Sequence, residues 1–157
     1  MYPISITGAK YFDTDQISDF NKNFIVKLSE KLMLREFSVN VHSMESGSFQ
    51  GVYFRFAWRP PNFLNMVTKG SFSISEHKSG FIKIKFRLVF TEFFYYCLAF
   101  TSIPLIFYNY WQVLIGGLLV VWLLFLGGTF LLAQMQFDTL LSSIYKELKP
   151  KKKVAKK

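Results

Sequence analysis

The alternation of apolar and polar residues predicts a small folded domain at the start of the chain. Ile4, Ile6 and Ala9 indicate a first strand, and Gly8 is expected to end or bend it. Apolar residues then recur at intervals of three or four, the spacing of one helix face. They are Ile17, Phe20, Phe24, Leu28 and Leu32. With Asp13-Thr14-Asp15 as an acidic N-cap segment, this pattern predicts a helix over residues 14–34.

From residue 37 the apolar period changes to two, which is typical of half-buried strands. Four such segments follow, at residues 37–41, 52–58, 71–75 and 82–88. Turn residues at 44–48 and 77–80 and a proline pair at 60–61 separate them. Short links favour an antiparallel meander whose apolar face the helix covers. The expected fold class is α+β: a cytoplasmic domain over residues 1–90 with a strand, a helix and a four-stranded antiparallel meander.

Residues 93–137 contain no charged side chain. A helix needs about 20 apolar residues to cross the ~30 Å hydrocarbon core of a bilayer, so this run is long enough for two crossings. The polar stretch 108–112 lies at its middle, where a turn between two spans belongs. We therefore expect a two-helix transmembrane hairpin over residues 91–135, with spans at about 91–109 and 112–135.

The net charge of +9 is concentrated on the two sides of this hairpin. Residues 1–92 carry 12 Lys and Arg against 8 Asp and Glu, and residues 138–157 carry 7 Lys against 2 acidic residues. Positive residues at both outer ends place both termini in the cytoplasm. The first residues show no basic stretch followed by an apolar run, so we expect no cleavable signal peptide. The expected location is a bacterial inner membrane, with two spans.

Apolar residues at helical spacing continue beyond the second span, from Phe137 to Leu148. They predict a short amphipathic helix within residues 136–157. This helix either extends the span into the cytoplasm or lies on the membrane interface. Pro150 is expected to end it, and the lysine-rich tail is expected to be disordered.

Two glycine pairs lie eleven residues apart in the second span. They are Gly116 with Gly117 and Gly127 with Gly128. Eleven residues at about 100° each bring both pairs to one face of a helix. Because glycine allows helix backbones to approach closely in lipid, the pairs predict a helix-packing surface. It would serve either a partner subunit or the first span of the same hairpin.

Basic residues flank the hairpin on both sides. Lys83, Lys85 and Arg87 precede the first span, whereas Lys151, Lys152 and Lys153 follow the second. Anionic lipid attracts such residues by about 1 kcal/mol each, so we predict headgroup contact for these six. Nucleic acid is not an expected partner, because the aromatic residues are not interleaved with the basic ones for base stacking.

The residues that could carry chemistry form no recognisable constellation. His42 and His77 have no cysteine or clustered carboxylate at ligand spacing, whereas a metal site needs three or four ligands. The serines at 71, 73 and 75 lack a partner base, and no phosphate-binding glycine loop occurs. The single cysteine, Cys97, lies inside the first span, where no reactive thiolate is expected. We therefore expect neither enzymatic activity nor a cofactor.

These observations favour a non-enzymatic accessory or assembly subunit of a larger bacterial inner-membrane complex. It would dock through its cytoplasmic domain and its glycine-bearing span. The expected partners are an integral-membrane protein or further copies of the chain, together with anionic lipid headgroups. The alternative is a self-oligomerising two-span effector or pore with a cytoplasmic sensing domain. That alternative has few polar residues in the spans to line a pore: Thr101, Ser102, Thr129 and Gln134.

Overall fold

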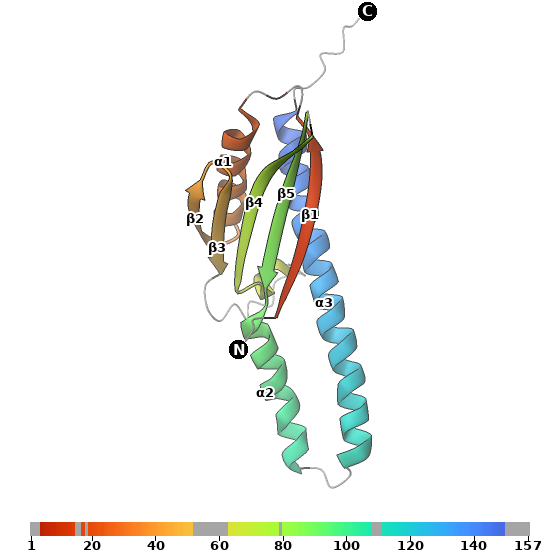
Figure 1. Ribbon diagram of the computed structural model, residues 1–157. Helices are drawn as coiled ribbons and strands as arrows, with labels where there is room; N and C mark the ends of the chain where they lie inside the picture. Colours follow the sequence, from red (N-terminus) through yellow and green to blue (C-terminus); the bar gives the residue numbers. More distant parts are fainter. Residues whose placement is uncertain are drawn as a thin grey trace, which may run out of the picture.

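A computed structural model of the chain describes residues 4–14, 17, 19–51, 63–78, 80–107 and 111–149. The elements, in chain order, are β1 (Ser5–Asp13), α1 (Phe20–Met33), β2 (Phe37–Ser43), β3 (Ser46–Gly51), η1 (Phe63–Met66), β4 (Lys69–Lys78), β5 (Phe81–Val89), α2 (Thr91–Phe107) and α3 (Trp111–Leu148). The predicted α+β class is confirmed. One sheet is covered on one face by α1 and part of α3, and α2 and α3 extend beyond it (Figure 1).

The five strands form one antiparallel sheet in the order β1-β5-β4-β3-β2. Strands β2 to β5 pair consecutively, as an antiparallel meander does, but its second strand is β3 and not the predicted segment 52–58. The first strand returns to pair with β5, from Ser5 opposite Val89 to Asp13 opposite Phe81. This long-range pairing leaves β1 and β2 at the two edges of the sheet.

Two predictions about the strands were wrong. Gly8 neither ends nor bends β1, which passes through it in register with Phe86. The Phe86 ring lies over Gly8 and occupies the space that a side chain would need. The turn predicted at 44–48 is shorter, because β3 already begins at Ser46 and pairs with both β2 and β4. Ladders on both sides outweigh the weak strand preference of serine and glycine. The strand predicted at 52–58 lies outside the described residues.

The helix α1 begins at Phe20, six residues later than predicted. The first predicted cap residue belongs to the sheet, because β1 extends to Asp13, and the Thr14 backbone N–H donates to the Gly80 carbonyl over 2.8 Å. Asp19 then adopts a left-handed conformation at φ 49°, so the predicted N-cap at 13–15 is wrong. The predicted apolar stripe is correct, since its members from Phe20 to Leu32 are buried against the sheet.

The longest element, α3, is one continuous helix of 38 residues, about 57 Å long at 1.5 Å per residue. Its last part packs on the sheet beside α1 and contributes core residues: Ala133, Phe137, Leu140, Leu141 and Ile144. Of the two positions considered for the amphipathic segment, extension of the second helix is correct and a separate helix on the membrane interface is wrong. The physical reason is that its apolar stripe finds protein partners, such as the rings of Phe49 and Phe86 around Phe137.

Among the described residues, one helix is long and apolar enough to cross a membrane by length and composition. It is α3, over Trp122–Leu148, with a mean hydropathy of 1.2. That stretch includes the part of α3 that packs in the domain core. Hydropathy alone therefore does not distinguish a segment buried in protein from one that crosses a membrane. The 17 residues of α2 reach about 26 Å, which is short of the ~30 Å of a hydrocarbon core. The predicted hairpin of two spans is therefore not established by the structure.

Candidate functional site

The two faces of the sheet differ in chemistry. Phe, Ile and Leu side chains point toward α1 and α3, and the alternate positions carry hydroxyl, amide and basic groups. Both α1 and α3 lie on the same side, so no described helix covers the second face (Figure 1). We call this second side the open face.

Four cations stand close together on the open face. Lys83, Lys85 and Arg87 occupy alternate positions of β5, opposite Ser75, Ser73 and Ser71 of β4. Alternate residues of a strand lie about 6.6 Å apart, so the three form a regular row. Lys69 on β4 continues it toward α2, since it pairs with Val89, two residues beyond Arg87. These four residues are called the basic ladder.

Neighbouring side chains contact three members of the basic ladder, and one of these neighbours is a carboxylate. The Arg87 Nε–H donates to the Ser5 hydroxyl over 3.0 Å. Lys83 lies with its Nζ 5.1 Å from the centre of the Tyr11 ring, within the range of a cation–π contact. At the other end, Lys69 interacts electrostatically with Glu92 at the start of α2.

A hollow of about 520 Å³ opens on the same face, beside the lower end of the basic ladder. Lys69 and Arg87 line one side of it. The other polar residues around it are Ser38, Asn40, Ser48, Gln50 and Ser71. The hollow therefore combines two cations with hydroxyl and amide groups, a lining suited to a carboxylate or another small anionic group.

The alternation of residues correctly indicated that Lys83, Lys85 and Arg87 share one side of a strand. Lys69 was missed because the predicted strand began at residue 71. Its signal was present in the sequence, since Lys69 lies two positions before Ser71 and so has the same orientation. Lys151, Lys152 and Lys153 lie outside the described residues.

The geometry of β5 bears on the predicted headgroup contact. The strands run in roughly the same direction as α2 and α3 (Figure 1), and β5 leads into α2 through the single residue Phe90. At 3.3 Å per residue, Arg87 lies about 13 Å before Thr91, and Lys83 about 26 Å before it. The basic ladder therefore rises away from the hairpin rather than lying in one plane across it. Headgroup contact stays a prediction for its lower end.

The junction between the sheet and the two long helices is packed with aromatic rings. Phe90 and Phe130 lie 4.7 Å apart between ring centres, and Phe94 meets Trp122 edge-on at 5.2 Å. Backbone groups add to this packing, since the Glu92 N–H donates to the Thr68 hydroxyl over 3.2 Å. These contacts fix the direction in which α2 and α3 leave the domain.

The glycine pair Gly127 and Gly128 does not form that junction. A side chain added at Gly127 or Gly128 would meet no other atom within 4 Å, so this pair does not pack against α2. Gly116 and Gly117 lie in the part of α3 whose side-chain surroundings the structure does not describe. The prediction of a packing surface for a partner subunit is neither supported nor contradicted by this arrangement.

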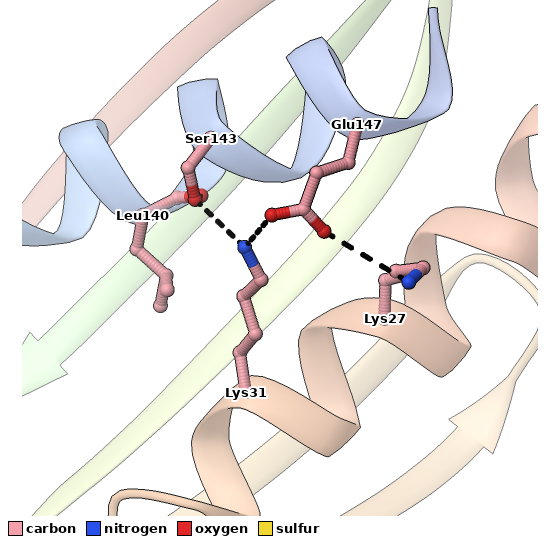
Figure 2. A network of polar contacts seen from close by, with 5 residues as sticks. All are labelled: Lys27, Lys31, Leu140, Ser143 and Glu147. Atoms are coloured by element: carbon pink, nitrogen blue, oxygen red, sulfur yellow. Dashed lines mark hydrogen bonds and ion pairs between the residues drawn. The ribbon is translucent and has the colours of Figure 1, made fainter.

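A polar network ties α1 to the end of α3 (Figure 2). The Lys31 ammonium donates to the Ser143 hydroxyl over 3.1 Å and forms an ion pair with Glu147, whose carboxylate also lies 3.9 Å from Lys27. The hydrogen bond from Lys31 lowers the pKa of Glu147, despite some opposing desolvation. Ser143 in turn donates to the Leu140 carbonyl over 2.8 Å. The network fixes the end of α3 on the domain.

The opposite edge of the sheet makes a second polar contact with α3. The Lys10 ammonium of β1 donates to the Asp138 carbonyl over 2.9 Å. Desolvation raises the pKa of the Asp138 carboxyl, and the charge of Lys10 opposes this shift. Lys10 and Lys31 thus anchor α3 from both sides.

An apolar groove of about 830 Å³ lies between α1 and the edge strand β2. Its exposed apolar residues are Val26, Met33, Leu34, Val41 and Met44. Because β2 is an edge strand, its outer backbone groups are not paired within the sheet. The groove is a second surface where another chain could bind.

The titratable residues show no catalytic arrangement in the part of the chain that the structure describes. No group of three or more His, Cys, Asp or Glu side chains there could hold a metal ion. His42 hydrogen-bonds Ser48 over 2.9 Å, and the His77 ring lies 5.0 Å from that of Tyr11. Both histidines are thus part of the polar lining of the open face.

Comparison with known proteins adds no assignment to this geometry. No protein-family model matches the chain, and neither a curated protein nor a solved structure matches it. A functional assignment therefore depends on the surfaces described above.

Proposed function

We propose that this protein is a non-enzymatic accessory or assembly subunit of a bacterial inner-membrane complex. In this proposal α2 and α3 both span the membrane, and both termini are cytoplasmic. The sheet holds its binding surfaces at a fixed distance from the bilayer. The observation that carries the proposal is the double connection between the sheet and the hairpin.

The first connection is the passage from β5 to α2. Phe90 is fully buried, and its backbone N–H donates to the Ile4 carbonyl over 2.9 Å. Its own carbonyl accepts the Phe94 N–H, so α2 follows the strand without a flexible linker. Such a junction restricts swinging of the sheet relative to α2.

The second connection is α3, which runs from Trp111 into the domain core without interruption. Ala133, Phe137 and Ile144 are completely buried, while the network around Lys31 closes the far end. A rotation of the sheet relative to the hairpin would break these contacts. Two rigid connections suit a subunit that positions a partner, because a mobile tether would leave the partner's orientation undefined.

The first half of α3 supports membrane insertion. It leaves large apolar side chains exposed at Leu119, Val120, Leu123 and Leu124, and Leu131 and Leu132 continue this just beyond the midpoint of the helix. A helix that is apolar on all sides requires lipid or other protein around it. In the proposed topology, basic residues stay on the cytoplasmic side and the uncharged turn crosses to the other side. The shorter α2 would require slight local thinning of the bilayer, at modest cost.

The proposal is tested by purifying the tagged full chain in a mild detergent and measuring its stoichiometry by native mass spectrometry. A stoichiometric integral-membrane partner is expected. A variant with four Gly and Ser residues inserted after Val89 should insert and fold but release the partner, because it loosens the first connection. Recovery of monomer alone would contradict the proposal, and recovery of a homo-oligomer that makes vesicles leaky would favour a pore.

A further inference from the structure

We propose that the open face of the sheet binds an acidic protein segment, whose Asp and Glu side chains pair with the basic ladder. This inference rests on the proposed function, since it names the chemistry of the partner that the subunit would hold. It differs from the headgroup contact expected for single basic residues, because it uses the ladder as one surface.

The charge of the open face carries the inference. Within the five strands, the side chains on this face include the four cations of the basic ladder and a single carboxylate, Asp13, at the far end of β1. A second carboxylate, Glu92 of α2, interacts with Lys69 at the other end, so the positive charge is greatest at Lys83, Lys85 and Arg87. The residues between the charged ones are mostly serine, with Thr7, Asn40 and Gln50. Lys69, Lys85 and Arg87 are exposed. Like charges about 6.6 Å apart repel one another, and a partner with carboxylates at matching positions would relieve this repulsion.

The spacing indicates how such a segment would lie. An extended chain with acidic residues at alternate positions repeats every ~6.6 Å, the same interval as the row on β5. The hollow that Lys69 and Arg87 line on one side would receive one carboxylate at the lower end of the row. The guanidinium of Arg87 can donate two parallel hydrogen bonds to a carboxylate, and the hydroxyls of Ser38, Ser48 and Ser71 lie around the same hollow.

The open face suits a protein segment better than a nucleic acid or a lipid surface. Binding of single-stranded nucleic acid depends on aromatic rings for stacking, and on this face Tyr11 and His77 lie together at one end, away from Arg87. A bilayer presents its headgroups in one plane. The basic ladder rises roughly along the axis of the hairpin, so such a plane would touch only its lower end (Figure 1).

The test uses the full chain in nanodiscs of neutral lipid and a fluorescein-labelled peptide in which glutamate alternates with serine over twelve residues. Binding is measured by fluorescence anisotropy at low salt. The ladder variant carries Lys83→Glu, Lys85→Glu and Arg87→Glu. The control variant carries Lys22→Glu, Lys146→Glu and Lys149→Glu, three exposed positions away from the open face that change the net charge equally. Circular dichroism melts establish that both variants are folded.

We expect the ladder variant to lose at least tenfold in affinity and the control variant to stay within about threefold of the wild type, since charge away from the interface acts mainly through the screened long-range field. Equal losses in the two variants would show non-specific attraction and overturn the inference. Tighter, ladder-dependent binding of a twelve-nucleotide uridine RNA would also overturn it. So would loss of peptide binding when the nanodiscs contain anionic lipid, because the ladder would then be bound to its own bilayer.

The same variants separate this inference from the proposed function. If the ladder variant loses the copurified partner and the control variant retains it, the open face is the docking surface. If the ladder variant retains the partner, the inference is wrong and the accessory-subunit proposal stands. If the wild type has no partner, the proposed function fails, and the peptide measurement alone decides whether the face binds acidic segments.

Discussion

The two halves of α3 have similar apolar content but different surroundings. Near the start of α3, Leu119, Leu123 and Leu124 are 61%, 75% and 73% exposed, and at about 100° per residue they spread over about 140° of the helix surface. In the last part, Phe137 and Ile144 are fully buried on one side while polar residues occupy the other. Apolar residues all around a helix indicate lipid or another subunit, whereas a one-sided stripe indicates a protein core. A single helix can therefore connect two environments, and its residue pattern shows where one gives way to the other.

The largest expected effect comes from truncating a side chain in the buried half. Phe137→Ala removes a ring stacked on Phe49 and in contact with Phe86, so it should lower the free energy of unfolding of the domain by about 3–5 kcal/mol. Leu123→Ala, in the exposed half, should leave it nearly unchanged. Hydrogen exchange of the sheet amides in detergent measures both. Equal effects would mean that the two halves do not differ in the way described.

A bulky residue at the exposed glycine pair should act on association and not on the domain. Gly128→Leu adds a side chain where this chain has no neighbouring atoms, so the fold should tolerate it. If the pair contacts another subunit, association should weaken by about 1–3 kcal/mol through overpacking. Native mass spectrometry measures the change, with Leu124→Ile as the matched control. An unchanged complex would show that this glycine pair is not part of the subunit contact.

A smaller effect is expected at the far end of α3, where Glu147 pairs with Lys31 and Lys27. Glu147→Gln should lower the melting temperature of the domain slightly at neutral pH. The folded-state pKa of Glu147 lies below its ordinary value of 4.5, so the ionised form stabilises the fold above that value. This contribution is lost as the pH falls through the lowered pKa.

Melting curves of the wild type and Glu147→Gln at pH 7 and at pH 3 test whether the ionised Glu147 carboxylate stabilises the fold. The difference between the two proteins should shrink at pH 3, where the wild-type carboxylate is increasingly protonated. A difference that stays constant would show that the network stabilises the helix through packing and not through charge.

Local sequence patterns predicted those features that depend on neighbouring residues. The stripe from Phe20 to Leu32 and the alternation on β5 follow from helical and strand periods, so these elements and the face of Lys85 could be predicted. The start of α1 could not, because it depends on the contact between Thr14 and Gly80, which are far apart in the chain. The start of β3 likewise depends on pairing with two other strands.

The candidate surfaces also combine features that depend on neighbouring residues with features that depend on contacts between distant parts of the chain. Alternation identified three of the four cations of the basic ladder, but the hollow beside Lys69 arises only when β3 and β4 are paired. The end of α3 was expected to be amphipathic, and its stripe is consistent with either a membrane surface or a protein core. The contact between Phe137 and Phe86 shows that the stripe packs in a protein core. Because these residues are about fifty positions apart in the chain, local sequence patterns could not predict this contact.

The rigidity of the connection through α3 is the central claim, and spin-label distances test it most directly. Labels at Leu123→Cys on the hairpin and Ser73→Cys on the open face, in a Cys97→Ser background, report the distance between the two parts in lipid nanodiscs. A second pair, Lys22→Cys with Ser73→Cys, gives the width expected within the folded domain. We predict one narrow distribution for the first pair, similar in width to that of the second. A broad or bimodal distribution for the first pair alone would contradict the account, because the sheet would then move freely relative to the hairpin.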